Sequence, residues 1–505
     1  MISPLSIIGV AGLLCVLAYK YILYPAFGSP LSALPTAHPL CSITSKWFDR
    51  QILRQRELTT LFAAHQKHGP LVRLGPHEVS VVSLEGLRNI YTAGLEKHSW
   101  YAATFENYGT PNLVSTLEHR PHSVQKRMIA NVYAKSYIQH STDVDTLSTS
   151  IVFGRFLPLL QKYADEREHV NVMHLFQWAG IDFMTAYIFG TAHCTDFMDD
   201  REGREAYFKD WSKIRNFDNS GENSVVEGLC MKLSSATLAA QDQPQNNDIA
   251  GTSPVVLSKL YSQLQQKAKA EDNQLSQTDL MKRCASELLD HIVATHETFA
   301  ITSTYVLYRM SLDPALQKKL RAELLALDPS VTPGAAEEGL LPSPDRIDAL
   351  PLLNGIIQET LRLHAAVPVR QPRVVPEGGI MLHSHYIPAG TTVSSNAYSL
   401  HRQPEIFPRP SEWLPQRWMA RDDRSPIVDS FPGPEVIRKW FWAFGSGGRM
   451  CIGSNFALQV IKLIIASIYT NFETSIIDDE GIEQSESFIA GPLGNKLIVQ
   501  FVPLT

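Results

Sequence analysis

The longest run of apolar residues lies near the start of the sequence, from Leu5 to Leu23, and Lys20 is the only Lys, Arg, Asp or Glu before Lys46. About 20 helical residues cross a hydrocarbon core of about 30 Å, so this stretch is long enough to span a membrane. No basic residue precedes the run, which argues against a cleaved signal peptide, and the lysine after it favours a lumenal tail. We therefore predict a retained single-pass transmembrane anchor over residues 1–25.

A proline-rich segment follows the apolar run. It contains Pro25, Pro30, Pro35 and Pro39. Proline fixes φ and interrupts helices, so we expect residues 26–46 to form a semi-rigid linker. The globular pattern begins near Trp47, and no later segment is poor enough in apolar residues to divide two cores. We expect one catalytic domain over residues 47–505.

Within this domain, apolar residues recur mostly with the period of a helix. Residues 49–68 have this pattern and predict one helix. The alternating runs 71–74 and 78–82 flank a Gly-Pro turn and predict a β-hairpin. Helical periodicity prevails from 84 to 325, and short strand patterns return at 379–382, 391–395 and 496–502. The sequence predicts a mainly α-helical fold with small β-sheets.

Composition and charge narrow the class of protein. The 505 residues are 44% hydrophobic and 19% charged, which is typical of a globular chain. A formal net charge of −6 argues against nucleic acid as the main partner. The six cysteines have neither zinc-finger nor disulfide-framework spacing, and no Asn-x-Ser/Thr acceptor occurs. Both observations favour a reducing compartment.

One cysteine differs from the others because it lies in a glycine-rich stretch. The stretch runs Phe444-Gly445-Ser446-Gly447-Gly448-Arg449-Met450-Cys451-Ile452-Gly453 and precedes an apolar helical pattern. Four glycines beside one thiol predict tight turns whose bare N–H groups stabilise a thiolate. A thiolate without a partner cysteine suits one coordination position on a haem iron. The alternative is a buried free cysteine beside a helix start, which is what most lone cysteines are.

The spacing Phe-x-x-Gly-x-Arg-x-Cys-x-Gly resembles the haem-binding signature of the cytochrome P-450 family at every fixed position. The resemblance implies that Cys451 is the axial ligand of the iron of haem b, that Arg449 pairs with a haem propionate and that Phe444 shields the sulfur. It also implies the cytochrome P-450 fold, with a single catalytic domain behind the N-terminal transmembrane helix.

Two further motifs resemble those of the family. Glu359 and Arg362 match its Glu-x-x-Arg motif within a helical pattern over 352–363, and Arg417 resembles the arginine that completes the triad, although Gln416 replaces the usual glutamate. A pair at i and i+3 is by default a surface pair worth less than about 1 kcal/mol. The apolar neighbours here predict burial, where the pair needs further hydrogen-bond partners. We expect all three residues to be structural.

A long helical pattern from 285 to 310 contains an acid followed by an alcohol. Glu297 and Thr298 match the pair that, in the family, relays protons to dioxygen, and a carboxylate and a hydroxyl can hold a water chain. The ordinary alternative is a glutamate on a wet face and a threonine that bonds the carbonyl four residues back. Thr295 and Phe299 replace the usual glycine and a common second threonine, so the shape of the oxygen groove stays open.

Several basic residues match positions at which the family holds the haem propionates. Arg373 occupies the position of a propionate arginine. His122 and Lys126 stand where the family carries Trp-x-x-x-Arg, and Arg127 is a further candidate. All of them donate hydrogen bonds to carboxylates, although lysine lacks the bidentate fork of arginine. Each alone is more often a solvated surface residue.

The resemblance covers nearly the whole chain and implies a membrane-anchored haem-thiolate monooxygenase. Such an enzyme inserts one oxygen atom from dioxygen into a hydrophobic small molecule by hydroxylation, epoxidation or oxidative rearrangement. No flavin or nicotinamide motif occurs, so electrons from NADPH are expected through NADPH-cytochrome P-450 reductase, with cytochrome b5 as a second donor. The expected location is the endoplasmic reticulum membrane, with the catalytic domain facing the cytosol.

The anchor and the stretch from Tyr386 to Trp418 are most similar to fungal enzymes of secondary metabolism. Two alternatives stay open. One is a haem-thiolate isomerase or dehydratase that does not use dioxygen, against which the Glu297 and Thr298 pair argues, and the other is a non-catalytic haem sensor. The residues expected to line the pocket lie around 100–116, 207–232 and 367–371, and they predict no particular substrate.

Overall fold

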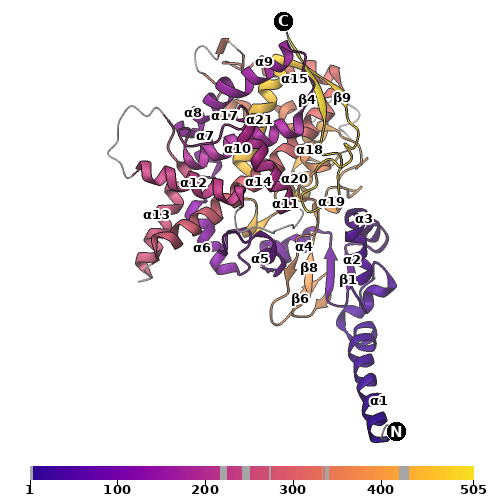
Figure 1. The fold of residues 1–505 in the computed structure, drawn as a ribbon. Coiled ribbons are helices and arrows are strands. Elements are labelled where there is room, and N and C mark those ends of the chain that lie inside the picture. The colour runs from indigo at the N-terminus through magenta and orange to yellow at the C-terminus, as the bar shows by residue number, and fades with distance from the viewer. Residues whose placement is uncertain are drawn as a thin grey trace.

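The computed structural model describes residues 4–215, 224–241, 251–271, 275–332, 334–335, 340–419 and 431–504. Helices form most of the body (Figure 1). Helix α1 projects from the end at which β1, β6 and β8 lie, and β4 and β9 lie towards the opposite end (Figure 1). The prediction of a mainly helical fold with small sheets is confirmed.

The helices follow one another along the chain in two groups. Those before residue 200 are α1 (Pro4–Ala18), η1 (Tyr19–Gly28), η2 (Pro30–Ala33), η3 (Pro39–Ser42), α2 (Lys46–Leu53), α3 (Glu57–His68), α4 (Leu84–Gly86), η4 (Leu87–Thr92), α5 (Trp100–Phe105), α6 (His119–Ile129), α7 (Lys135–His140), α8 (Thr142–Ile151), η5 (Val152–Phe156), α9 (Leu157–Asp165) and α10 (Val172–Phe189). Those after it are α11 (Arg201–Arg215), α12 (Val225–Gln241), α13 (Val255–Ala270), α14 (Gln277–Ser311), α15 (Pro314–Leu324), α17 (Pro344–Asp348), α18 (Pro351–Leu363), α19 (Ala397–Leu400), η6 (Pro415–Trp418), α20 (Pro434–Trp440), η8 (Gly447–Arg449) and α21 (Ser454–Asn471).

The strands form three sheets. The largest has the order β1-β2-β8-β5-β3, with the strands β1 (Leu71–Gly75), β2 (Glu78–Val81), β8 (Thr392–Ser394), β5 (Arg373–Val374) and β3 (Glu96–Lys97). The second has the order β4-β10-β9, with β4 (Val170–Asn171), β10 (Ile498–Pro503) and β9 (Phe472–Asp478). The third is the pair β6 (Ile380–Leu382) and β7 (His385–Ile387). In the largest sheet, Lys97 of β3 lies opposite Arg373 of β5.

Near the N-terminus, the chain forms the predicted hairpin but not the predicted single helix. The hairpin is confirmed, because β1 and β2 pair antiparallel with Leu71 opposite Val81. The single helix expected over residues 49–68 is wrong. The chain breaks it into α2 and α3, and Gln55 between them adopts a φ of 55°, in the left-handed region that a continuous helix does not allow.

The core is built around α10 and α14. Helix α10 is apolar on nearly every face, as expected of a helix enclosed by others, and it packs along α14. Ser276 caps α14, with its Oγ accepting the N–H of Asp279 at 3.1 Å. The helix has 35 residues and runs for about 52 Å. Its middle turns therefore lie deep in the body.

The N-terminal helical segment from Leu5 to Gly28 is, within the described residues, the one helix long and apolar enough to cross a membrane, with a mean hydropathy of 2.0 over its most apolar window. The segment that follows it packs against the body, because Leu31 and Leu34 are buried in the cluster that covers the largest sheet. The buried Arg73 guanidinium donates to the carbonyl of Pro25 at 3.0 Å. The end of the apolar helix is thereby tied to strand β1.

Candidate active site

The glycine-rich loop between α20 and α21 is folded back by its own backbone hydrogen bonds. The N–H of Cys451 donates to the carbonyl of Phe444 at 2.9 Å, and the N–H of Met450 donates to that of Gly447 at 3.1 Å. Gly447 has a φ of +71°, and a Cβ on it would lie 2.3 Å from the carbonyl oxygen of Tyr91. Glycine is therefore required there. The turn places Cys451 shortly before the first residue of α21.

The Cys451 thiol borders open space. Its side chain is exposed, and no atom lies within 4 Å of the position that a Cβ would take on Gly448 or Gly453. Although the side chain is accessible, desolvation by the surrounding protein raises the pKa of the Cys451 thiol, whereas the N–H groups of Gly453 and Ser454 and the ammonium of Lys126 lower it. These dipoles and this cation favour the thiolate form of Cys451.

The middle of α14 carries accessible residues near the thiol. Ala294 is exposed, and Asp290 and Thr298 are partly exposed, although the helix runs through the core. The three residues are four apart and so share one face of the helix. The Asp290 carboxylate raises the pKa of Cys451, which places this face within electrostatic range of the thiol.

The two residues expected to relay protons lie on different sides of α14. Thr298 Oγ1 donates to the carbonyl of Ala294 at 2.8 Å and borders the open space. Glu297 is fully buried, and its Oε1 accepts hydrogen bonds from Trp211 Nε1 of α11 at 2.7 Å and from Gln177 Nε2 of α10 at 3.3 Å. A relay from Glu297 to Thr298 therefore requires water to reach the buried carboxylate of Glu297.

The residues that depart from the family pattern on this helix are accommodated without a break in α14. Thr295 Oγ1 donates to the carbonyl of His291 at 2.8 Å, as a mid-helix threonine ordinarily does. Phe299 is buried and meets Phe176 of α10 edge to face, with 6.1 Å between the ring centroids. It packs between the two core helices.

Three cations, Lys97, Arg373 and Arg449, gather near the pairing of β3 with β5, and the first two are buried. Lys97 Nζ donates to the carbonyl of Val114 at 2.6 Å, and Arg449 Nη1 donates to that of Thr116 at 2.8 Å. Burial, together with Arg373 and Arg449, holds the pKa of Lys97 well below its usual range. Burial and Arg373 lower the pKa of Arg449 to about 10. Within the described residues, no ion pair joins these three cations to a carboxylate.

The three basic candidates on α6 lie in different environments. His122 is buried beside the cations, and burial together with Arg449 lowers its pKa to about 3, so it is neutral. Lys126 Nζ donates to the carbonyls of Gly448 at 2.9 Å and Met450 at 2.8 Å, and so holds the cysteine loop. Arg127 is exposed. The third candidate therefore lies away from the cluster.

Glu359, Arg362 and Arg417 meet in a site from which water is excluded. Arg362 Nε and Nη2 each donate to one carboxylate oxygen of Glu359 at 2.8 Å, and Arg417 Nε donates at 3.1 Å. All three side chains are 0% exposed. Trp418 Nε1 and the N–H of Leu414 also donate to Glu359, both at 2.9 Å, which supplies the additional partners that a buried ion pair needs.

His401 connects this triad to the cysteine loop. Its Nε2 accepts the N–H of Trp442 at 2.7 Å, and its Nδ1 lies 2.9 Å from the carbonyl oxygen of Arg362. Burial and Arg362 lower the pKa of His401 to about 3. The ring is thus neutral, with the proton on Nδ1. Trp442 stands two residues before Phe444, so the triad fixes the start of the loop that carries Cys451.

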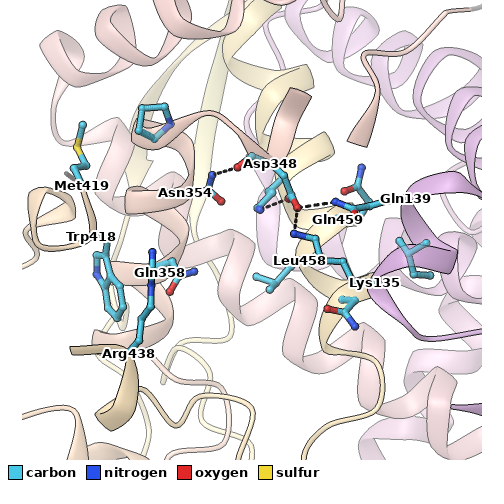
Figure 2. Close-up of a pocket in the computed structure, with 14 residues that line it drawn as sticks. Lys135, Gln139, Asp348, Asn354, Gln358, Trp418, Met419, Arg438, Leu458 and Gln459 are labelled. Carbon is cyan, nitrogen blue, oxygen red and sulfur yellow. Dashed lines mark hydrogen bonds and ion pairs between the residues drawn. The ribbon is translucent and has the colours of Figure 1, made fainter. Parts of the chain in front are cut away.

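A separate cavity of about 400 Å³ lies between α7, α18 and α21 (Figure 2). Asp348 accepts hydrogen bonds from Lys135 at 2.6 Å, Lys462 at 2.5 Å and Gln139 at 2.9 Å. Burial alone would raise the pKa of Asp348, but the two lysines lower it. This cluster joins α7 and α17 to α21, while Arg438 on the rim is exposed (Figure 2).

A lone accessible cysteine in a glycine turn, facing a long helix, is the arrangement of a haem-thiolate protein, and a sequence comparison identifies the family. The family model described as Cytochrome P450 matches residues 232–499, just over half of the chain. The chain belongs to the cytochrome P450 family, whose members use haem iron and receive electrons from NAD(P)H through a partner reductase.

The chain is similar to curated fungal proteins over most of its length. It is 29% identical to cytochrome P450 monooxygenase avaI of Aspergillus versicolor over 409 residues, which are 78% of this chain and 93% of that protein. It is 26% identical to cytochrome P450 monooxygenase orf2 of Aspergillus niger over 524 aligned positions, 97% of each chain. It is also 26% identical to cytochrome P450 monooxygenase sdnE of Sordaria araneosa, over 91% of each chain.

The residues beside Cys451 fit a haem. A haem brings two carboxylates, and the buried Lys97 and Arg373 and the partly buried Arg449 lack carboxylate partners in the described part of the chain. In addition, Arg449 Nε is buried without a hydrogen-bond acceptor. Buried donors are ordinarily paired, so an anionic group is the partner that this cluster requires.

Lys97 is the member of this cluster that the sequence motifs miss. We expect Lys97→Met to lower the ratio of haem to protein several-fold, because it removes one of the three cations that would bind the haem carboxylates. Haem absorbance per polypeptide after gel filtration measures the effect, with circular dichroism to show that the fold is kept. Lys46→Met, which removes an exposed lysine, is the matched control. Equal haem content in both variants would exclude Lys97 from haem binding.

Proposed function

We propose that this chain is a membrane-anchored haem-thiolate monooxygenase of fungal type that inserts one oxygen atom from dioxygen into a hydrophobic small molecule. Hydroxylation, epoxidation and oxidative rearrangement are the reactions that this chemistry allows, and secondary-metabolite biosynthesis is the proposed setting. The observation that carries the proposal is the accessible Cys451 thiol, which lies within electrostatic range of the helix α14 that carries Thr298. The similarity to fungal monooxygenases over nearly the whole chain supports it.

The roles of the site residues follow from their positions. When bound, the haem supplies the oxygen-activating chemistry. Cys451 would hold the iron, with Phe444 beside it, and Arg449, Arg373, Lys97 and His122 would receive the propionates. Lys126 fastens the cysteine loop from outside. The triad of Glu359, Arg362 and Arg417 supports the loop through the hydrogen bonds of His401 described above.

Thr298 is proposed to position a proton at its hydroxyl. Its Oγ1 donates to the carbonyl of Ala294, so its lone pairs are available to accept a hydrogen bond from water in the open space. Glu297 is the proposed proton donor one residue away, and the hydrogen bond from Trp211 holds its carboxylate in place.

Thr298→Ala tests this function. With purified reductase and a turned-over substrate, we expect NADPH consumption to continue while the yield of oxygenated product per NADPH falls about tenfold or more. Thr302→Ala is the matched control, because Thr302 makes the same hydrogen bond to the carbonyl four residues back, at 2.9 Å, but is buried. Unchanged yield in Thr298→Ala would refute the relay, and turnover without NADPH would instead indicate an isomerase or dehydratase.

Electron supply is proposed to come from NADPH-cytochrome P-450 reductase, with cytochrome b5 as a second donor. Arg438 is exposed at the rim of the cavity beside α21, the helix that begins after Cys451, whereas the exposed Lys135 there pairs with Asp348. Basic side chains at such a surface favour an acidic partner. We place the anchor at residues 1–25, the linker at 26–46 and the catalytic domain at 47–505, in the endoplasmic reticulum membrane and facing the cytosol.

A hydrophobic substrate fits the aromatic residues at one part of the expected pocket lining. Trp100 and Phe105 of α5 meet Phe488, with ring centroids 5.1 Å and 5.3 Å from it. All three rings are partly exposed. Of the other expected segments, residues 216–223 within 207–232 lie outside the described residues.

A further inference from the structure

The cavity beside α21 is a second space that the candidate active site does not use. It is formed by α7, α17, α18, α20 and α21, together with Trp418 of η6 and Met419 after it. Its volume of about 400 Å³ is within the range of cavities that bind small organic molecules. No residue assigned to the haem, to the proton relay or to the buried triad lines it.

Positive charge exceeds negative charge on the lining of this cavity. Among the described residues, its charged side chains are those of Lys135, Lys462, Arg438 and Asp348. Asp348 pairs with both lysines, at 2.6 Å and 2.5 Å, so two cations share one carboxylate. The exposed Arg438 guanidinium makes no ion pair or hydrogen bond with another residue that the structure describes. The cavity therefore presents a surplus of positive charge and an unpaired guanidinium.

Two side-chain amides in the cavity also lack partners. Gln459 of α21 is 8% exposed, and Gln358 of α18 is partly buried. Both line the cavity, and neither amide makes a hydrogen bond within the described ranges. Buried polar side chains are ordinarily hydrogen-bonded, and an amide offers both donors and an acceptor. A polar molecule in the cavity is a partner that both amides can reach.

Apolar side chains complete the lining. They include Trp418, Met419 and Leu458, of which the last two are partly exposed. Figure 2 shows Trp418, Gln358 and Arg438 towards one side of the cavity and the ion pairs of Asp348 towards the other. A side that combines a guanidinium with an indole suits an anionic group carried on a flat apolar ring.

We propose that this cavity binds a small aromatic carboxylate, with the carboxylate on Arg438 and the ring against Trp418. A guanidinium and a carboxylate match in geometry and in charge. A singly charged carboxylate suits the site better than a doubly charged phosphate, because Asp348 shares the cavity. Arg438 lies on α20 and Gln459 on α21, the two helices that flank the cysteine loop, so the ligand would link both ends of that loop. The inference goes beyond the proposed oxygenation and uses no step of it.

Two probes of similar shape and different charge test the site on the haem-loaded full chain. One is naphthoate and the other is the neutral naphthamide. Excess phenylimidazole is present with both, because it ligates haem iron and fills the space beside it. We expect calorimetry to show that naphthoate binds about tenfold or more tightly than naphthamide, the range of a hydrogen-bonded charge. Equal dissociation constants for the two probes would overturn the proposal.

Arg438→Gln removes the proposed contact with the carboxylate. It should abolish the preference for naphthoate and leave the dissociation constant of naphthamide unchanged. Lys439→Gln is the matched control, because it removes the next exposed cation of α20, which does not line the cavity, and it should keep the preference. A preference that survives Arg438→Gln, or one that falls equally in both variants, would contradict binding in this cavity.

Gln459→Met tests the contact on the other side of the cysteine loop. Methionine is similar in size to glutamine but has no amide, so naphthoate should bind several-fold more weakly. Circular dichroism shows whether the fold is kept, since Gln459 is buried. An unchanged dissociation constant in folded Gln459→Met would overturn the link between α20 and α21.

Discussion

Replacing Glu359 by glutamine is expected to destabilise the catalytic domain by about 3–5 kcal/mol, the cost of breaking a buried ion pair from one side. Five donors converge on this carboxylate, three of them from Arg362 and Arg417 and two from Trp418 and Leu414. Glutamine removes the charge and replaces one acceptor oxygen by an NH₂ group. Two guanidinium groups then remain in a dry site without an anion.

The midpoint of urea unfolding, followed by circular dichroism, measures this effect. The control is Glu412→Gln, because Glu412 pairs with Arg409 at 3.1 Å while the two side chains are 52% and 43% exposed. Such a surface pair is worth less than about 1 kcal/mol. If the two variants unfold at the same midpoint, the buried triad does not hold the domain as described.

Replacing Cys451 by alanine is expected to have the second large effect, a complete loss of NADPH-dependent oxygenation. The sulfur is the proposed iron ligand, and no neighbouring side chain of the cysteine loop offers another thiolate. Product formation with the reductase measures the loss, and the absorbance of the haem shows whether thiolate ligation is gone. Cys194→Ala removes a half-buried thiol that lies 3.6 Å from Arg155 and should keep both signals. Oxygenation that persists in Cys451→Ala would disprove the ligand assignment.

The parts of the site that sequence could predict are those fixed by local spacing. Phe444 and Cys451 lie in one short loop, and Glu359 and Arg362 lie on one face of one helix. The members of each pair are close in sequence, so their proximity in space can be predicted. The burial of Arg417 follows from the same motif, since Trp418 beside it must be covered. The mainly helical fold class can be predicted for a similar reason, because helical periodicity is a local signal.

The parts that sequence missed depend on contacts between distant segments. Lys97 meets Arg373 through the pairing of β3 with β5, and nothing near residue 97 signals that partner. The side to which Glu297 points is decided by Trp211 on another helix.

Secondary-structure prediction failed where the chain changes conformation without a glycine or proline to signal the change. Helix α21 passes directly from Asn471 into β9 at Phe472, with neither glycine nor proline at the junction, and β9 was not predicted. The proline-rich linker is predicted to act as a spacer. In the structure it is also fixed to the sheet, by the burial of Leu31 and Leu34 and by the hydrogen bond from Arg73 to Pro25.

The central claim is that the sulfur of Cys451 binds haem iron. The absorbance spectrum of the freshly purified full chain, loaded with haem, reduced and exposed to carbon monoxide, tests this bond most directly. We predict the red-shifted Soret band of a thiolate-ligated haem, absent in Cys451→Ala. A Soret band without that shift, in protein that circular dichroism shows to be folded, would contradict both the ligand and the proposed enzyme.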